Sequence, residues 1–433
     1  MKMPAYLVKV VTTLKQNGYQ ALVVGGCVRD ILLGSEPADY DVATSANVQE
    51  IRALFQKTVP IGERHGTVAV LIDGFTVEVS TFRGHALGES STGLEQDLSH
   101  RDFTVNAMAF AEDGSLYDPF GGQQDLQNKI IRSPRDEPEQ RFMEDPLRML
   151  RAIRFCSTLG FSMHSDTYQA ITKQYALLQV VAPERIREEL NRILLSGRSA
   201  RGIRLMLETG LLQYVVPEAV PMAGFDQRSS RHNKDVFEHT LAVVEGAPPR
   251  LKVRLAALLH DIGKPNTFSV DEKGAGHFYG HHIEGRKMVE AIMKRLKYDN
   301  KTIEDVSVLV VEHMSRYPKV RNASLKRLVN RVGEHNLEDL FDLQQADIMG
   351  AAPPFNFSEL AALRAGINRI LNEKPPMSLK DLAIKGNDLI ELGFQPGPEM
   401  GRVLDLLLEV VLEDPDKNDR DILLKLAAKY KEG

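Results

Sequence analysis

The spacing of hydrophobic and polar residues differs between the two ends of the chain. Residues 5–17 have the period of a short amphipathic helix, and the apolar run at 21–26 ends in a glycine pair, which predicts a strand entering a turn. Residues 67–82 are rich in β-formers around a central Asp-Gly pair and predict a hairpin, whereas the small polar residues 84–97 predict a loop. From about residue 140 onward only helical periodicity is found. The pattern predicts an α+β protein, with a mixed sheet and helices first and an all-helical body after it.

Length and composition narrow the class of protein. The 433 residues are enough for about three domains. Two cysteines, Cys27 and Cys156, are too few for a disulfide scaffold and favour a reducing, cytoplasmic environment. No apolar run approaches the roughly 18 residues of a membrane span, and residues 1–20 lack the apolar core of a secretory signal. The net charge of −5 argues against non-specific coating of nucleic acid but leaves room for a local basic patch.

A glycine pair and two nearby carboxylates form the first candidate site. Gly25 and Gly26 connect the predicted strand to a predicted helix, a turn whose backbone N–H groups can hold a phosphate, and Arg29 lies in the first turn of that helix. Asp39 and Asp41 are spaced i, i+2, which in a strand places both carboxylates on one face. Two carboxylates beside a phosphate site suit paired Mg²⁺ ions in phosphoryl transfer.

Two further interpretations of residues 25–78 are possible from the sequence: a third carboxylate in the site, and a purely structural role for the whole group. Glu78, in the predicted hairpin, is a candidate third carboxylate, because alternation places it on one face of its strand. A purely structural role is the alternative for the whole group, since glycine pairs make ordinary turns and aspartates also occur on solvated strands.

The residues GGCVRD at 25–30 and DYDVAT at 39–44 resemble the signature of the nucleotidyltransferase superfamily that includes DNA polymerase β. More narrowly, the chain resembles the class II tRNA nucleotidyltransferases, which build the 3′-terminal CCA of tRNA. Five further blocks follow in the order and spacing of that family: GERHGTVAV at 62–70, HRDFTVNAMAF at 100–110, DPFGGQQDL at 118–126, EDPLRMLRAIRF at 144–155 and APERIREEL at 182–190.

The resemblance implies a role for each matching residue. Asp39 and Asp41 would hold Mg²⁺, while the 3′-OH of tRNA attacks the α-phosphate of the nucleotide and releases pyrophosphate. Asp145 and Arg148 share a helical face at i, i+3 and would act as an amino-acid template that selects the base. The remaining nucleotide-binding residues are Arg151 and Arg154 for the triphosphate, and Arg101, Asp102 and Asn106 for ribose and phosphate.

The loop that follows the predicted hairpin bears on the product. Family members that add all of CCA tend to carry a longer, arginine-rich loop there, whereas residues 84–97 are short and have Arg83 only at their edge. A shortened loop is the mark of members that add only CC, so we expect CC addition from CTP. Full CCA addition with CTP and ATP is the alternative, and a poly(A) polymerase ranks behind it.

The histidines point to a second site. Eight of the 12 lie between residues 232 and 335, about a quarter of the chain. Imidazoles and carboxylates on successive helices suit divalent transition metals. Their order resembles the HD superfamily of metal-dependent phosphohydrolases. The resemblance implies six ligands: His239, His260, Asp261 and Asp347 for one metal, with His281 and His313 completing a second.

This second site supports a hypothesis from another class, in which the head is a degenerate RNA-binding module and the HD site is a working hydrolase. The intact carboxylates of the head favour the transferase instead. The segment 316–331 contains no acid and offers a candidate tRNA-binding patch, with a solvated helical face as the alternative. The basic residues of that patch are Arg316, Lys319, Arg321, Lys326, Arg327 and Arg331.

Four segments are expected from these observations. They are a nucleotidyltransferase head at 1–138, a helical neck at 139–224, an HD domain at 225–370 and a helical tail at 371–433.

Overall fold

The computed structural model describes residues 3–62, 66–82, 93–135, 137–228, 234–315, 321–373 and 375–432. The chain forms two compact units, Met1–Val215 and Val216–Gly433. The predicted head and neck together correspond to the first unit, which ends nearer the N-terminus than the expected boundary at 224. Residues 84–92 of the predicted loop, together with Arg316 and Lys319, lie outside the described residues. Within the described ranges, no helix combines the length and apolar character needed to cross a bilayer.

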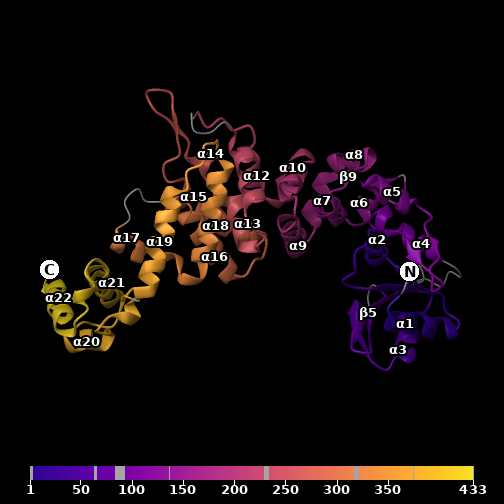
Figure 1. Ribbon diagram of the computed structural model, residues 1–433, viewed down its shortest axis with the longest axis horizontal. Coiled ribbons are helices and arrows are strands. Elements are labelled where there is room, and N and C mark those ends of the chain that lie inside the picture. The colour runs from indigo at the N-terminus through magenta and orange to yellow at the C-terminus, as the bar shows by residue number, and fades with distance from the viewer. Residues whose placement is uncertain are drawn as a thin grey trace. The chain divides into compact units, whose positions relative to one another are not determined.

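The described part of the first unit is built on a mixed sheet of seven strands in the order β3-β4-β5-β2-β1-β6-β7 (Figure 1). β2 and β5 run parallel, and the other neighbouring strands run antiparallel. The strands are β1 (Ala21–Val24), β2 (Asp41–Thr44), β3 (Thr58–Gly62), β4 (Thr67–Ile72), β5 (Phe75–Thr81), β6 (Ala109–Phe110) and β7 (Leu116–Tyr117).

The hairpin predicted at 67–82 is confirmed. β4 and β5 pair through a turn at Asp73 and Gly74, whose φ angles of 52° and 85° suit a type I′ turn. In the ladder Val70 lies opposite Val77, and this pair is fully buried. β-Branched residues on the covered face therefore fix the register, because a slip of one residue would expose them.

Helices cover the sheet and then continue alone. The helix expected at 5–17 is confirmed as α1 (Ala5–Gln16), and its buried stripe includes Leu7 and Leu14. The other helices of this unit are α2 (Gly26–Leu32), α3 (Val48–Leu54), α4 (Leu94–Ser99), α5 (Gly122–Asn128), α6 (Pro138–Glu144), α7 (Leu147–Leu159), α8 (Ser165–Gln174), α9 (Pro183–Leu194), α10 (Ser199–Glu208) and α11 (Leu212–Val215). Since α4 begins at Leu94, the last residues of the predicted loop at 84–97 are helical.

One expectation about strands is wrong. The body after residue 140 is not entirely helical, because β9 (Ser162–Met163) pairs in parallel with β8 (Ile130–Ile131), and β10 (Ser269–Val270) pairs with β11 (Gly276–His277). Each of these strands has two residues, too few to produce a periodic pattern, and backbone pairing between loops creates them.

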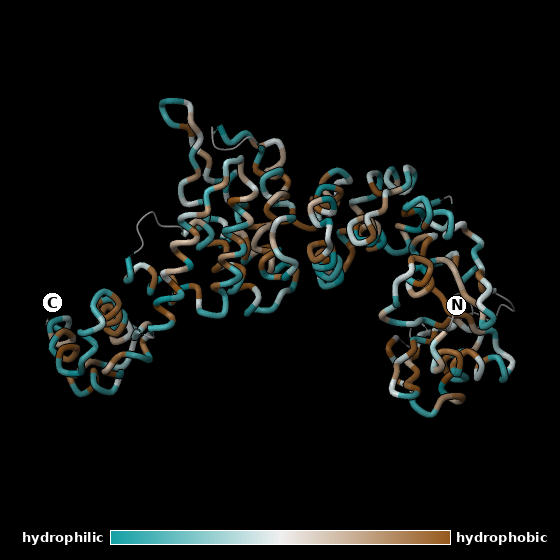
Figure 2. Tube along the Cα trace, viewed as in Figure 1, coloured by the Kyte–Doolittle hydropathy of each residue, from teal (hydrophilic) through white to brown (hydrophobic). Residues whose placement is uncertain are grey.

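The second unit is almost wholly helical, with hydrophobic and hydrophilic stretches alternating along its helices (Figure 2). Asp235 starts the first of them by accepting a hydrogen bond from Glu238 N. Its helices are α12 (Val236–Gly246), α13 (Leu251–Leu259), α14 (Lys264–Thr267), α15 (His281–Arg295), α16 (Asn300–Glu312), α17 (Asn322–Val332), α18 (Leu337–Gly350), α19 (Ser358–Glu373), α20 (Gly386–Glu391), α21 (Pro398–Glu413) and α22 (Arg420–Glu432). The last three helices bury their own apolar cluster, which includes Leu389, Leu407 and Leu423.

Gly202→Ala tests how tightly α10 packs on α7 and α9. A Cβ at Gly202 would lie 2.4 Å from Ser157 Oγ and 2.5 Å from Ile193 Cγ2. We expect a loss of about 1–3 kcal/mol in the free energy of unfolding, although alanine favours a helix by about 1 kcal/mol. The matched control is Gly197→Ala, where an added Cβ meets no described atom within 4 Å, and it should change stability by less than about 0.5 kcal/mol. Equal losses in urea denaturation of the two variants would contradict this packing.

Candidate active site and metal-binding centre

Gly25 lets two charged side chains approach the backbone at the end of β1. Its φ of 85° lies in the left-handed region that favours glycine. A Cβ there would lie 2.6 Å from Arg101 Nη1 and 3.2 Å from Asp41 Oδ2. Gly26 then begins α2. The predicted glycine pair therefore forms the floor of a small charged site.

Three carboxylates meet beside this floor. Asp41 on β2 lies opposite Glu78 on β5 in the parallel ladder. Burial raises the pKa of Asp41 to about 6; Arg101 opposes this rise, and the charges of Glu78 and Asp39 add to it. The expectation that both aspartates lie within the strand is wrong, because β2 begins at Asp41 and Asp39 lies in the preceding bend. The charges of Glu78 and Asp39 act on Asp41, and carboxylate oxygens are the donors that suit Mg²⁺.

A buried carboxylate organises the neighbouring nucleotide-binding candidates. Asp102 accepts hydrogen bonds from Phe103 N at 2.9 Å, Asn106 Nδ2 at 2.8 Å and Arg151 Nε at 2.9 Å. Burial alone would raise the pKa of Asp102, but the charge of Arg151 and these hydrogen bonds hold it well below its usual range. Arg29 Nη1 in turn donates to Asn106 Oδ1 at 2.7 Å.

The predicted base-reading pair has a different local geometry from the one expected. Asp145 does not share a helix with Arg148, because it lies in extended conformation at the end of α6, while α7 begins at Leu147. Arg148 is buried and donates to the carbonyl oxygens of Arg141 at 3.0 Å and His100 at 2.9 Å. Asp145 Oδ2 accepts from Arg185 Nη2 at 3.1 Å. The junction between α6 and α7, rather than one helical face, therefore determines the positions of the Asp145 and Arg148 side chains.

Arg154, which is predicted to bind the triphosphate, also contacts an acidic side chain. Its guanidinium Nε lies 2.9 Å from Glu189 Oε2, and both side chains are largely buried between α7 and α9. Burial lowers the pKa of Arg154 to about 10, against the opposing charge of Glu189. Glu189 and Arg185, which contact Arg154 and Asp145, were not predicted as site residues, although both lie in the APERIREEL block.

The six predicted ligands of the second site come together inside the second unit. His239, His260 and Asp261 form one candidate metal-binding triad, and Asp261, His281 and His313 form another, each with ligand atoms within 4.8 Å of one another. Asp347 Oδ1 lies 3.1 Å from His239 Nε2. Since Asp261 belongs to both triads, its carboxylate is placed to bridge two cations.

The ring orientation of three histidines suits metal binding. His260, His281 and His313 each direct Nδ1 to a backbone carbonyl three residues earlier, at 2.9, 2.8 and 2.6 Å. This leaves Nε2 of each ring facing the centre. Burial lowers the pKa of His281 and lowers that of His313 to about 3, so these rings are neutral, as ligation requires.

Sequence reasoning did not identify Lys264 at this centre. Its Nζ lies 2.8 Å from Asp261 Oδ2 and 3.2 Å from Gln227 Oε1, and the side chain is buried. The fixed spacing of three residues after Asp261, one helical turn, was the available signal.

The predicted tRNA-binding patch is largely used for internal contacts. Lys326 is buried and donates to Leu412 O at 3.1 Å, while Arg327 pairs with both Glu409 and Glu413 on α21. Arg331 pairs with Glu312 at 2.6 Å. The expectation of a phosphate-binding face is therefore wrong for these three residues, which instead attach α17 to neighbouring helices. Arg321 is exposed.

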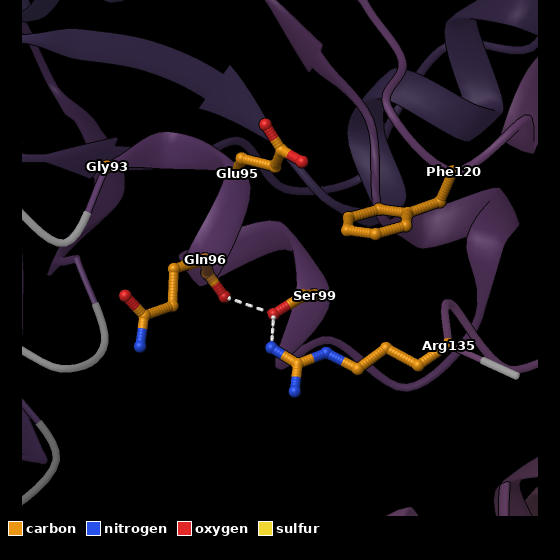
Figure 3. Close-up of a pocket in the computed structure, with 6 residues that line it drawn as sticks. All are labelled: Gly93, Glu95, Gln96, Ser99, Phe120 and Arg135. Carbon is orange, nitrogen blue, oxygen red and sulfur yellow. Dashed lines mark hydrogen bonds between the residues drawn. The ribbon is translucent and has the colours of Figure 1, made fainter. Parts of the chain in front are cut away.

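A cavity of about 470 Å³ lies on another face of α4 (Figure 3). Arg135 donates to Ser99 Oγ at 2.5 Å there, and Ser99 donates to Gln96 O. Asp97 points to the opposite side of the helix, where it pairs with Arg101. The lining residues are Gly93, Glu95, Gln96, Ser99, Phe120 and Arg135.

The order of the segments along this chain matches that of known protein families. Three family models match consecutive segments: the poly A polymerase head domain at 21–132, the probable RNA and SrmB-binding site of polymerase A at 160–222, and the HD domain at 236–349.

Individual relatives cover nearly the whole chain. The A-adding tRNA nucleotidyltransferase of Deinococcus radiodurans is 36% identical, covering 90% of this chain and 91% of that protein. The CC-adding tRNA nucleotidyltransferase of Thermus thermophilus is 33% identical, covering 91% of this chain and 90% of that protein. The structure of the Bacillus stearothermophilus CCA-adding enzyme in complex with CTP superimposes with a TM-score of 0.75 at 30% identity, covering 100% of this chain and 99% of that one.

Asp41→Asn tests the electrostatic cost of the carboxylate cluster. The pKa of Asp41, at about 6, lies above its value in the unfolded chain, so the unfolded chain loses this proton first as the pH rises. Its contribution to stability is therefore fully present below about pH 4 and is lost by about pH 6. Without metal, Asp41→Asn should raise the free energy of unfolding by about 2 kcal/mol at pH 8 and leave it unchanged near pH 4.

Urea denaturation with a chelator present measures this difference. Asp113→Asn, which removes an exposed carboxylate of the same unit, is the control and should show no such gain at pH 8. A loss of stability for Asp41→Asn at pH 8 would contradict the strain inferred for the cluster.

Proposed function

Because the chain belongs to the CCA-adding family of tRNA nucleotidyltransferases, we propose that it adds cytidines (CC) to the 3′ end of tRNA from CTP. The observation that carries this proposal is the placement of Asp41 opposite Glu78 in the β2–β5 ladder, beside the Gly25 turn and Arg101, with the charge of Asp39 also acting on Asp41. Family membership makes the chain an enzyme that depends on divalent metal.

The residues of the first unit account for the proposed reaction. The 3′-OH of the tRNA releases its proton to solvent as its oxygen forms a bond to the α-phosphorus of CTP, and the bond from that phosphorus to the bridging oxygen of pyrophosphate breaks. Two Mg²⁺ ions held by Asp39 and Asp41, with Glu78 beside them, would stabilise the charge on both oxygens. Arg101 adds positive charge next to Asp41. Asp102 and Asn106 are the residues proposed to hold the ribose.

Base selection is assigned to the junction of α6 and α7. The carboxylate of Asp145 can accept a hydrogen bond from the amino group of cytosine, and the guanidinium of Arg148 can donate to its ring nitrogen and carbonyl oxygen. Backbone carbonyls accept hydrogen bonds from Arg148, and Arg185 donates a hydrogen bond to Asp145. The side chains of Asp145 and Arg148 are therefore held in place before a nucleotide binds. Rigid placement of this kind favours discrimination between bases.

The restriction to CC rests on the short connection between β5 and α4. Its residues include one arginine, Arg83, and the arginine-rich lever expected of members that complete CCA is missing from the sequence. Full CCA addition and A addition are the alternatives, and relatives with each activity are similar to this chain. The cytoplasm is the compartment proposed for this reaction, in keeping with the two cysteines of the chain.

The second unit supports an additional activity. Two triads that share Asp261, with three rings whose Nδ1 atoms face backbone carbonyls and leave Nε2 directed inward, favour a pair of divalent transition metals. Metal-assisted hydrolysis of a phosphoester is the chemistry such a centre performs, and Lys264 adds a cation beside the bridging carboxylate.

Incubation of tRNA lacking CCA with CTP, ATP or both tests the transferase. The product should end at CC even when ATP is present, and Asp39→Ala or Asp41→Ala should reduce incorporation by at least about 10³-fold, because the metal-holding carboxylates are lost. Electrophoresis at single-nucleotide resolution measures the product.

Asp113→Ala, which removes a solvent-exposed carboxylate elsewhere in the unit, controls for charge and should keep full activity. A product ending in CCA would exclude the restriction to CC, and retained activity in either site variant would exclude the proposed site.

Asp261→Asn and His313→Ala test the second centre by metal content after dialysis. The wild-type chain should retain about two transition-metal ions, His313→Ala about one and Asp261→Asn none, because Asp261 is shared by both triads. His335→Ala is the control, since that exposed histidine pairs with Asp305 away from the centre and should leave the metal content unchanged. A metal-free wild-type chain would contradict the proposal.

A further inference from the structure

The ring of Phe155 is surrounded by positive charge. The Cζ atoms of Arg154, Arg29 and Arg151 lie 4.2, 5.3 and 6.0 Å from its centroid. The ring is 6% exposed and packs edge-on against Phe103, with centroids 5.7 Å apart. A cation within about 6 Å of an aromatic face is attracted by the negative face of the ring. One buried side chain therefore contacts three guanidinium groups that come from α2 and α7.

Hydrogen bonds close a circuit around this ring. Arg29 donates to Asn106, Asn106 donates to Asp102, and Arg151 donates to the other oxygen of Asp102. Phe155 completes the circuit by contacting Arg29 and Arg151 at its two ends. These are the residues assigned to the nucleotide, so the ring lies at the centre of that group.

Each guanidinium has an acidic partner as well as the ring. Arg29 pairs with Asp30 at 2.7 Å, Arg151 pairs with Asp102, and Arg154 pairs with Glu189 at 2.9 Å. The carboxylates contact guanidinium nitrogens, while the ring lies within about 6 Å of each Cζ. Like charges repel, and burial increases that repulsion. An aliphatic side chain of similar volume would fill the space but would not attract three cations.

We infer that Phe155 is a positioning residue that gathers these three arginines to receive the polyphosphate of the nucleotide, an inference that rests on the proposed function. The ring does not touch the reacting atoms. It fixes the guanidinium planes, and the arginines then bind the phosphate oxygens by charge-assisted hydrogen bonds. Loss of the ring weakens binding of the polyphosphate and leaves recognition of the base, at Asp145 and Arg148, as it was.

Phe155→Leu is the variant that tests this inference. The KM for CTP should rise about tenfold while kcat changes less than about threefold, because binding of phosphate in the ground state is lost. The preference for CTP over UTP should stay the same. Binding of inorganic tripolyphosphate, measured by calorimetry without turnover, should weaken by the same tenfold. Phe155→Tyr, which keeps the aromatic face, should restore both constants to within about twofold.

Phe142→Leu is the matched control for packing. Phe142 is a fully buried ring of α6 that none of these three guanidiniums faces in the described part of the chain. The Phe142→Leu substitution should leave the affinity of the chain for tripolyphosphate unchanged. Equal losses in the two leucine variants, a fall in kcat at constant KM, or failure of Phe155→Tyr to restore binding would overturn the inference.

The calorimetric measurement separates this inference from the proposed function. A wild-type chain that binds tripolyphosphate through Phe155 but extends no tRNA would refute the transferase and leave the positioning role intact. If the wild-type chain extends tRNA and Phe155→Leu has the same KM for CTP, the transferase is supported and the positioning role of Phe155 is refuted.

Discussion

The contact between the buried carboxylate of Asp102 and the partly exposed guanidinium of Arg151 is the interaction on which the first unit depends. A carboxylate removed from water is costly unless donors surround it. Asp102 meets this demand with the Phe103 N–H, Asn106 and Arg151. Because Arg151 lies on α7, while Asp102 and Asn106 lie beside the sheet, satisfying one buried charge joins the sheet region to the following helices. The candidate nucleotide site forms at that joint.

The second unit follows the same physical rule with a different donor set. Asp261 is buried among His239, His260, His281, His313 and Lys264. Burial opposes its negative charge, yet the neighbouring His260 and Lys264 hold its pKa well below the usual range. Metal ions would take over the role that the protonated groups have in the metal-free chain. In both units a buried aspartate therefore determines which side chains must come together, and the chemistry follows from that requirement.

Surface arginines and lysines illustrate why charge in a sequence is an uncertain guide to binding. The basic run at 316–331 has the composition of a phosphate-binding face, yet Arg327 and Arg331 bind glutamates of neighbouring helices and Lys326 caps the end of α21. Arg154 likewise turns to Glu189. The glutamate partners of these arginines and the backbone carbonyl that Lys326 contacts are distant in sequence, so no local pattern could indicate these contacts.

The sequence by itself determined the fold class, the hairpin at Asp73-Gly74, the glycine turn before the carboxylates and the six residues of the second centre, because local periodicity and the order of motifs depend only on neighbouring residues. Tertiary structure decided the rest. It brought Glu78 beside Asp41 through a parallel strand pair, placed Asp145 outside the helix of Arg148 and gathered three arginines around Phe155. Strand order, the break between α6 and α7, and helix packing set these positions, and none of the three can be read from residue spacing alone.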